Sequence, residues 1–270
     1  MLPKIAVIGA GTMGGALIKG LLREALIDPR DLIAVDPWEE RRAYLKAQYN
    51  VETSADNAAA ARQAEIVFLS VKPQVMHMVF ADLRGVIRPE MLVFSIAAGV
   101  PVSKIQRGLE VQSVIRAMPN TPAQIGQGIT VWTATPAVSE QQRAHALTIL
   151  RALGEEVYVE DEHYLDMATA LSGTGPAYIY LFMEAMVDAG VHLGFSRHVA
   201  EKLVFHTVIG SANSARQSGL HLAALRNQVT SPGGTTAEAL YHLDKGGFRT
   251  VLSRAIWAAF VRSEALGRDE

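Results

Sequence analysis

The chain has 270 residues, a formal net charge of −2 and no cysteine. Its length suits a nucleotide-binding domain with a second, smaller one, and a charge near zero without a basic cluster argues against a nucleic-acid partner. The lack of cysteine excludes disulfides, thiolate catalysis and iron–sulfur clusters.

The start of the chain leads at once into an apolar strand, so we expect no signal peptide. The most apolar long stretch, residues 176–194, is interrupted by Glu184 and Asp188, so we interpret it as a buried helix and not a membrane span. The eight histidines form no recognisable ligand pair, and we assign no metal. We therefore expect a soluble, cytoplasmic protein.

A glycine-rich loop follows the first strand. Residues 4–8 form a short apolar run, residues 9–14 read Gly-Ala-Gly-Thr-Met-Gly, and residues 15–23 have a helical pattern. In this context the first glycine permits a tight turn, the second lets a pyrophosphate approach the backbone, and the third allows close packing of helix and strand. The candidate cofactor-binding residues of this loop are Gly9, Gly11, Thr12, Met13 and Gly14.

The second strand, residues 31–35, ends at Asp36. An acidic residue about 20 positions after the glycine loop usually accepts hydrogen bonds from the adenosine ribose, which favours NADH. Arg41 and Arg42 follow closely and could instead bind the 2′-phosphate of NADPH. The sequence therefore leaves the choice between NADH and NADPH open.

Strands and helices alternate through the first half of the chain. Further strands are expected at residues 65–71, 91–97, 112–117, 128–132 and 155–159, and further helices at 38–48, 55–63, 74–83 and 139–153. Such alternation predicts parallel strands joined by right-handed crossovers. The expected fold is α/β, with a Rossmann-type doubly wound parallel sheet in residues 1–160.

The strand pattern stops at about residue 161. Helices are expected at residues 163–171, 176–193, 197–218, 222–228, 235–243 and 248–266. Residues 161–270 are therefore predicted to form an all-α domain. Its helices carry more apolar surface than one chain can cover, which predicts a homodimer.

Three turns follow strands of the predicted sheet, where ligands of such folds bind. They are residues 71–73, 97–99 and 118–122. Small residues in the second turn would let a dinucleotide lie against the backbone, and Asn120 in the third could bond nicotinamide or substrate. The cofactor-binding candidates of the first two turns are Val71, Lys72, Pro73, Ala97 and Ala98.

A second glycine bend lies in the helical half, where residues 229–236 read Val-Thr-Ser-Pro-Gly-Gly-Thr-Thr before a helical run. Proline fixes one backbone angle, and the glycines permit positive φ and close approach of another molecule. The helix start offers unpaired N–H groups, which suit a carboxylate or phosphate. The ordinary alternative is a turn followed by a threonine cap.

These motifs, in this order, resemble those of the pyrroline-5-carboxylate reductase family along essentially the whole chain. The segments that carry the resemblance are residues 9–14, 71–73, 95–100, 116–122, 171–178 and 229–244. The resemblance implies reduction of 1-pyrroline-5-carboxylate to L-proline with NADPH or NADH, the last step of proline synthesis. It also implies an intertwined dimer and leaves open whether dimers assemble further.

The resemblance also implies roles for single residues. Asn57 joins the cofactor contacts, and the hydroxyl of Thr236 would point at the imine nitrogen. The residues implied to hold the substrate are Ser231, Gly233, Gly234, Thr235 and Thr236, with Asn120 as a further candidate. Two features depart from the family pattern: Asp36 follows the second strand, and residues 219–222 lack the usual Glu and Pro.

Residues 171–178 and 229–236, the core of the family-specific motifs, contain no His, Asp or Glu that could act as a general acid. We therefore expect the substrate to arrive protonated, or to take its proton from water, with Thr236 as a hydrogen-bond donor. One alternative is a β-hydroxyacid dehydrogenase, which would need a lysine where Ile179 stands. Another is a non-catalytic dinucleotide-binding protein, which would have no reason for a second anion pocket.

Overall fold

The structure is a computed structural model that describes residues 1–268, and it divides into two compact units. Unit 1 is Met1–Thr174 together with the chain from Ala259 onward, and unit 2 is Gly175–Ala258. The predicted boundary between residues 160 and 161 follows the last strand, whereas the packing divides the chain after Thr174. Unit 2 is thus inserted between two segments of unit 1.

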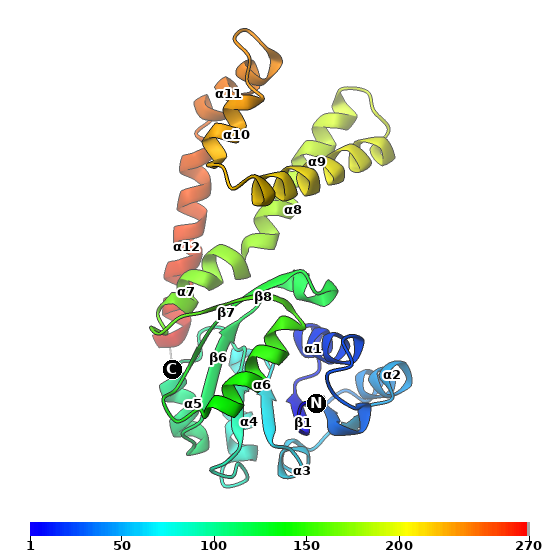
Figure 1. Cartoon of the computed structure of the whole chain (residues 1–270), viewed down its shortest axis with the longest axis vertical. Coiled ribbons are helices and arrows are strands. Elements are labelled where there is room, and N and C mark those ends of the chain that lie inside the picture. The colour runs from blue at the N-terminus through cyan, green and yellow to red at the C-terminus, as the bar shows by residue number, and fades with distance from the viewer. Residues whose placement is uncertain (269–270) are drawn as a thin grey trace. The chain divides into compact units, whose positions relative to one another are not determined.

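Unit 1 is built on one eight-stranded sheet with the order β3-β2-β1-β4-β5-β6-β7-β8 (Figure 1). The strands are β1 (Ile5–Ile8), β2 (Leu32–Val35), β3 (Glu52–Ser54), β4 (Ile66–Leu69), β5 (Leu92–Ser95), β6 (Val114–Met118), β7 (Gly128–Ala134) and β8 (Gly154–Tyr158). Neighbouring strands from β3 to β6 pair in parallel. The chain order reverses at β1, whose carboxyl end is therefore where a ligand of this fold class binds.

The last two strands differ from the predicted parallel arrangement. β7 pairs antiparallel with β6, and β8 pairs parallel with β7. The connection between β6 and β7 holds only a short 3₁₀ turn, Thr121–Ile125. A parallel pairing needs a crossover of a dozen or more residues, so this short connection turns the chain back instead.

Helices cover both faces of the sheet. The helices of unit 1 are α1 (Thr12–Arg23), α2 (Glu39–Tyr49), α3 (Asn57–Arg62), α4 (Met76–Leu83), α5 (Val102–Leu109), α6 (Glu140–Arg151) and α7 (Tyr164–Ala168). Ile5 and Val7 point into a core shared with α1 and α6, while Ala6 and Ile8 point into a core shared with α3, α4 and α5. Burial on both faces explains why the central strands are apolar throughout.

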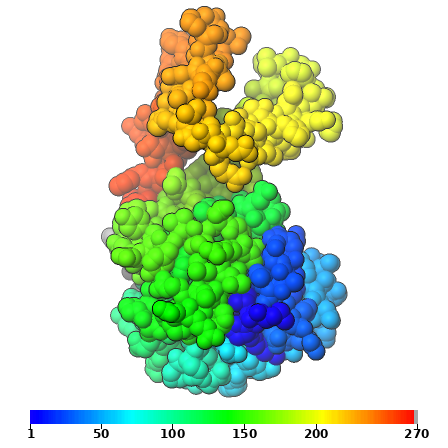
Figure 2. Space-filling model, viewed as in Figure 1, coloured from blue at the N-terminus to red at the C-terminus, as the bar shows by residue number. Residues whose placement is uncertain are grey.

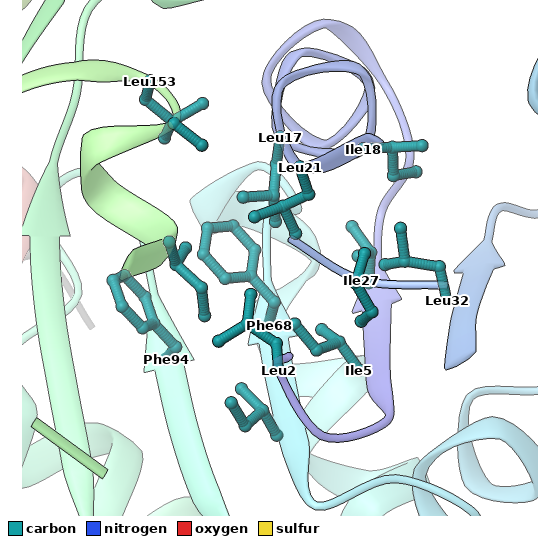
Figure 3. Close-up of a cluster of buried hydrophobic side chains, with 14 of the residues drawn as sticks. Leu2, Ile5, Leu17, Ile18, Leu21, Ile27, Leu32, Phe68, Phe94 and Leu153 are labelled. Atoms are coloured by element: carbon teal, nitrogen blue, oxygen red, sulfur yellow. The ribbon is translucent and has the colours of Figure 1, made fainter. Parts of the chain in front are cut away.

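Figure 3 shows the first of these cores, where Leu17 and Leu21 of α1 point toward Phe68 of β4. Phe68 and Phe94 stack with ring centroids 4.9 Å apart. In the space-filling view the blue-to-green part of unit 1 is one closely packed body (Figure 2). Such packing holds β1 and α1, and hence the glycine loop between them, in fixed positions.

Unit 2 is helical, as predicted. It contains α8 (Gly175–His192), α9 (Arg197–Ser218), α10 (Leu222–Gln228), α11 (Thr235–Lys245) and the first part of α12 (Phe248–Arg268). Its core is small, with Val187, Ala200 and Val204 buried between α8 and α9. Large exposed apolar side chains include Tyr180, Leu181, Leu203, Ile209, Val251 and Trp257. No helix within residues 1–268 combines the length and apolarity that crossing a membrane requires.

Candidate active site

The glycine loop has the geometry that a dinucleotide pyrophosphate requires. Gly9 has φ of +87°, and a side chain on Gly14 would collide with the carbonyl oxygen of Gly9. Gly11 faces open space, and it precedes α1 without any side-chain cap on the helix end. The first N–H groups of α1 are therefore available to an anion, so this chain's own residues fit the cofactor.

Arg41 of α2 braces the same loop. Its Nε donates to the carbonyl oxygen of Ala10 at 2.6 Å, and its Nη2 donates to that of Gly11 at 3.0 Å. A side chain on Gly15 would collide with this guanidinium, so the glycine at that position makes room for the arginine. Arg41 thus holds the loop through its carbonyl groups and leaves the uncapped N–H groups at the start of α1 free.

A pocket of about 570 Å³ adjoins the loop along α1 and α2. It is lined by Gly11, Thr12, Gly15, Ala16, Lys19, Arg41, Tyr44, Tyr49, Gln124 and Ile125. Burial raises the pKa of the Tyr49 phenol, and the neighbouring Tyr44 raises it further. Tyr49 therefore stays neutral at physiological pH, and the charge of the pocket wall comes from Lys19 and Arg41.

Asp36 lies at the carboxyl end of β2, the strand next to the glycine loop. The backbone N–H of Gly9 donates to the carbonyl oxygen of Val35 at 2.9 Å, which joins the loop to the end of β2. Asp36 is 7% exposed, and its Oδ1 accepts the backbone N–H of Trp38 at 3.0 Å. Asp36 therefore lies at the position from which the sequence predicts that it binds the adenosine ribose.

The turns after β4 and β5 meet the same edge of the sheet. A side chain on Gly9 would lie 2.7 Å from Cγ1 of Val71, so Val71 packs against the glycine loop. Lys72 is exposed, and Pro73 opens a 3₁₀ turn before α4. In the turn after β5, Ala97 is buried and Ala98 is half-buried. The structure thus brings these predicted cofactor residues to one edge with Asp36.

The two candidate asparagines already have protein partners. Asn57 donates from Nδ2 to Oδ2 of Asp82 at 2.8 Å. Asn120 accepts the backbone N–H of Ile129 at 3.0 Å and donates to the carbonyl oxygen of Ser172 at 3.2 Å. Both side chains therefore tie segments of unit 1 together, and their contacts with cofactor or substrate stay predictions.

The sequence reasoning missed an ion cluster beside these turns. Arg116 of β6 is 3% exposed and donates from Nη1 to Oε1 of Glu162 at 2.7 Å. Its Nη2 lies 3.7 Å from Oδ1 of Asp166, which also accepts the hydroxyl of Ser263 on α12 at 2.8 Å. An arginine within an otherwise apolar strand is the signal that could have indicated a buried partner.

The second glycine bend lies in unit 2, directly before α11. Gly233 has φ of +69°, and the N–H of Gly234 donates to the carbonyl oxygen of Ser231 at 3.1 Å. Gly234 is the N-cap of α11 and no side chain caps that end, so the threonine-cap alternative is not what forms here. Ser231 and Thr235 are exposed and Thr236 is half-buried. Backbone donors and hydroxyl groups are thus grouped at the positive end of an eleven-residue helix.

Comparison with known proteins decides the family. The family model described as "Pyrroline-5-carboxylate reductase dimerisation" matches residues 162–266, and the model "NADP oxidoreductase coenzyme F420-dependent" matches residues 4–99. A pyrroline-5-carboxylate reductase of Synechocystis sp. is 42% identical, with 98% of this chain and 98% of that protein covered. The chain belongs to the pyrroline-5-carboxylate reductase family. The enzyme of that name from Pseudomonas aeruginosa is 41% identical over 99% of this chain and 98% of its own length.

Solved structures of the pyrroline-5-carboxylate reductase family share the fold described above. A pyrroline carboxylate reductase of Plasmodium falciparum with NADP bound superimposes with a TM-score of 0.90 at 30% identity, covering 98% of both chains. A pyrroline-5-carboxylate reductase of Coxiella burnetii gives a TM-score of 0.89 at 35% identity, again over 98% of both. The residues matched by the dimerisation model include α8 and α9, which expose large apolar side chains in the single chain.

Proposed function

We propose that this protein reduces 1-pyrroline-5-carboxylate to L-proline with NADPH or NADH, the last step of proline biosynthesis. The observation that carries the proposal is 42% identity to a pyrroline-5-carboxylate reductase over 98% of both chains. Both glycine bends also have the local geometry that this activity needs, one for a pyrophosphate and one for a carboxylate.

The amino-terminal bend holds the coenzyme. Its pyrophosphate would lie on the uncapped end of α1, which Arg41 braces from the carbonyl side. The bound NAD(P)H supplies the hydride. Val71 and Asp36 lie at the same edge and would contact the nicotinamide and adenosine halves respectively.

The second bend holds the substrate carboxylate. Ser231 and the N–H groups of Thr235 and Thr236 would bind it, because they stand at a helix end that no side chain caps. Clamping the carboxylate fixes the orientation of the substrate, and hydride transfer itself requires about 3–3.5 Å between the reacting atoms. We assign to the hydroxyl of Thr236 a hydrogen bond to the imine nitrogen, with water or the protonated substrate as the source of the proton.

Unit 2 would complete its fold in a homodimer. Its buried core is small and its long helices expose large apolar side chains, which a second copy of the chain would cover. The match of residues 162–266 to a dimerisation model supports the same arrangement. We also propose that the enzyme acts in the cytoplasm, where its substrate and reduced coenzymes are available.

Purified protein tests the proposal directly. We expect oxidation of NADH or NADPH that depends on added pyrroline-5-carboxylate, with stoichiometric formation of proline. A panel of β-hydroxyacids with NAD or NADP serves as the rival assay, and we expect no turnover because Ile179 on α8 cannot move a proton. Binding of coenzyme without turnover of any substrate would support a non-catalytic nucleotide-binding protein instead.

A further inference from the structure

The end of β2 carries the groups that decide between the two coenzymes. NADPH differs from NADH by a phosphate on the adenosine ribose, and that group brings about two negative charges. In this fold class the ribose lies at the end of the second strand. Three carboxylates follow that strand here: Asp36 directly after it, and the exposed Glu39 and Glu40 in the first turn of α2.

The Asp36 carboxylate is held in place by one hydrogen bond and keeps one oxygen available as an acceptor. Its Oδ1 accepts the N–H of Trp38 at 3.0 Å, whereas its Oδ2 accepts no hydrogen bond from residues 1–268. With only 7% of the residue exposed, water screens this carboxylate poorly. A ribose hydroxyl would donate to the free oxygen, but a phosphate in the same place would meet a like charge at low dielectric.

The two arginines that could have bound a phosphate each bond backbone carbonyl oxygens of the coenzyme site. Arg41 bonds the carbonyl oxygens of Ala10 and Gly11. Arg42 donates from one nitrogen, Nη1, to the carbonyl oxygens of Asp36 and Pro37, both at 2.8 Å. Moving either guanidinium away from these carbonyl oxygens to reach a phosphate would break bonds that shape the coenzyme site itself.

We propose that Asp36 makes this enzyme selective for NADH, and that Arg41 supports the binding of both coenzymes alike without contacting a 2′-phosphate. This inference rests on the proposed function only where turnover of pyrroline-5-carboxylate is measured. Coenzyme affinity can be measured without any substrate, so the two proposals can fail separately.

The experiment titrates NADH and NADPH against the full-length protein at fixed ionic strength, with nucleotide fluorescence as the readout. The wild type should bind NADH at least about tenfold more tightly, the effect of one charged hydrogen bond gained or lost. Asp36→Asn keeps the acceptor for Trp38 but removes the charge, and it should reduce that ratio about tenfold or more. Asp36→Ser provides a second variant, and melting temperatures verify that each is folded.

Two further variants make the result specific. Asp31→Asn removes the same charge at the opposite end of β2 and should leave the ratio of affinities unchanged. Arg41→Met should weaken NADH and NADPH by similar factors, because the lost bonds hold the glycine loop. Equal or tighter binding of NADPH by the wild type would overturn the inference. So would a selective loss of NADPH in Arg41→Met, or an Asp36→Asn ratio no different from that of Asp31→Asn.

Turnover adds an independent measurement. With pyrroline-5-carboxylate as substrate, kcat/KM should favour NADH in the wild type and shift toward NADPH in Asp36→Asn. A protein that binds NADH selectively but reduces no imine would contradict the proposed function and still support the role of Asp36.

Discussion

Arg116 and Glu162 form an ion pair of 2.7 Å between the middle of the sheet and the segment that leads into α7, and the same Glu162 oxygen accepts the N–H of Val102 at the start of α5. The arginine is almost fully buried. Glu162→Ala would leave its charge with Asp166 alone, at 3.7 Å. We expect a loss of about 2 kcal/mol in the free energy of unfolding, measured with urea.

The exposed pair of Arg197 and Asp188, 2.8 Å apart on the surface of unit 2, is the matched control. Asp188→Ala should change the free energy of unfolding by less than about 1 kcal/mol. Similar losses in the two variants would show that burial adds nothing to the pair at Arg116.

Thr236 carries the assigned contact with the imine nitrogen. Thr236→Ala should lower kcat/KM for pyrroline-5-carboxylate by about 10- to 100-fold while the affinity for NADH stays the same. Thr236→Ser retains the hydroxyl and should keep most of the activity. If the alanine variant turns over normally, the hydroxyl has no part in the reaction.

Gly14 and Gly11 serve different purposes although both belong to the glycine loop. A methyl group at residue 14 would strike the carbonyl oxygen of Gly9, whereas one at residue 11 would enter open space. We expect Gly14→Ala to lower both the melting temperature and the coenzyme affinity. Gly11→Ala should weaken coenzyme binding with little change in melting temperature, since only the approach of the pyrophosphate is blocked. Equal melting temperatures in the two variants would contradict this division.

The Asp28 carboxyl group should titrate at an unusually low pH and contribute less to stability in acid. Its hydrogen bonds with Arg30 lower the pKa of its carboxyl group from 3.8 to about 2. Because this folded-state pKa lies below the unfolded value, the pair favours the folded state above pH 3.8, and that contribution disappears as the pH falls through about 2. Carboxyl-detected NMR should show the low titration midpoint.

Arg30→Gln should move the midpoint of Asp28 back toward its ordinary value. The Glu90 carboxyl, whose pKa is lowered by its own backbone N–H and by Arg88, is the internal control and should not move. An Asp28 midpoint that is the same with and without the Arg30 guanidinium would remove the arginine as the cause.

Leu203 tests the proposed dimer. It is a large apolar residue of α9 and 49% exposed in the single chain. A glutamate there would place a charge on a surface that a partner should cover, so Leu203→Glu should convert dimers to monomers in light scattering. Gln217→Glu adds the same charge at an exposed position of the same helix and should leave the dimer intact. Unaltered dimers with glutamate at 203 would exclude this part of α9 from the interface.

The sequence predicted best where a single local pattern decides the structure. β1, the glycine loop and α1 follow from an apolar run, three spaced glycines and a helical period, and all three occur as expected. β3 was missed because Glu52–Ser54 is short and polar and is held only by pairing with β2. α5 was missed because its eight residues include only two buried side chains, Ile105 and Leu109.

Contacts and strand pairings between distant segments could not be predicted from the sequence. The reversed direction of β7 depends on a connection whose length matters more than its composition. The partners of Asn120 and Arg116 come from segments 52 and 46 positions away, so no local spacing indicates them. An amide near a ligand edge looks available in a sequence even when backbone groups of the protein occupy it.

The return of α12 to unit 1 makes the chain from Ala259 onward part of the coenzyme-binding unit. Leu266 packs against Gly99, in the turn after β5, and Ser263 bonds Asp166. Trimming or fusing the tail would consequently disturb the half of the molecule encoded first. Residues 263–266 must therefore leave the ribosome before the coenzyme half, which starts at Met1, can acquire its final contacts.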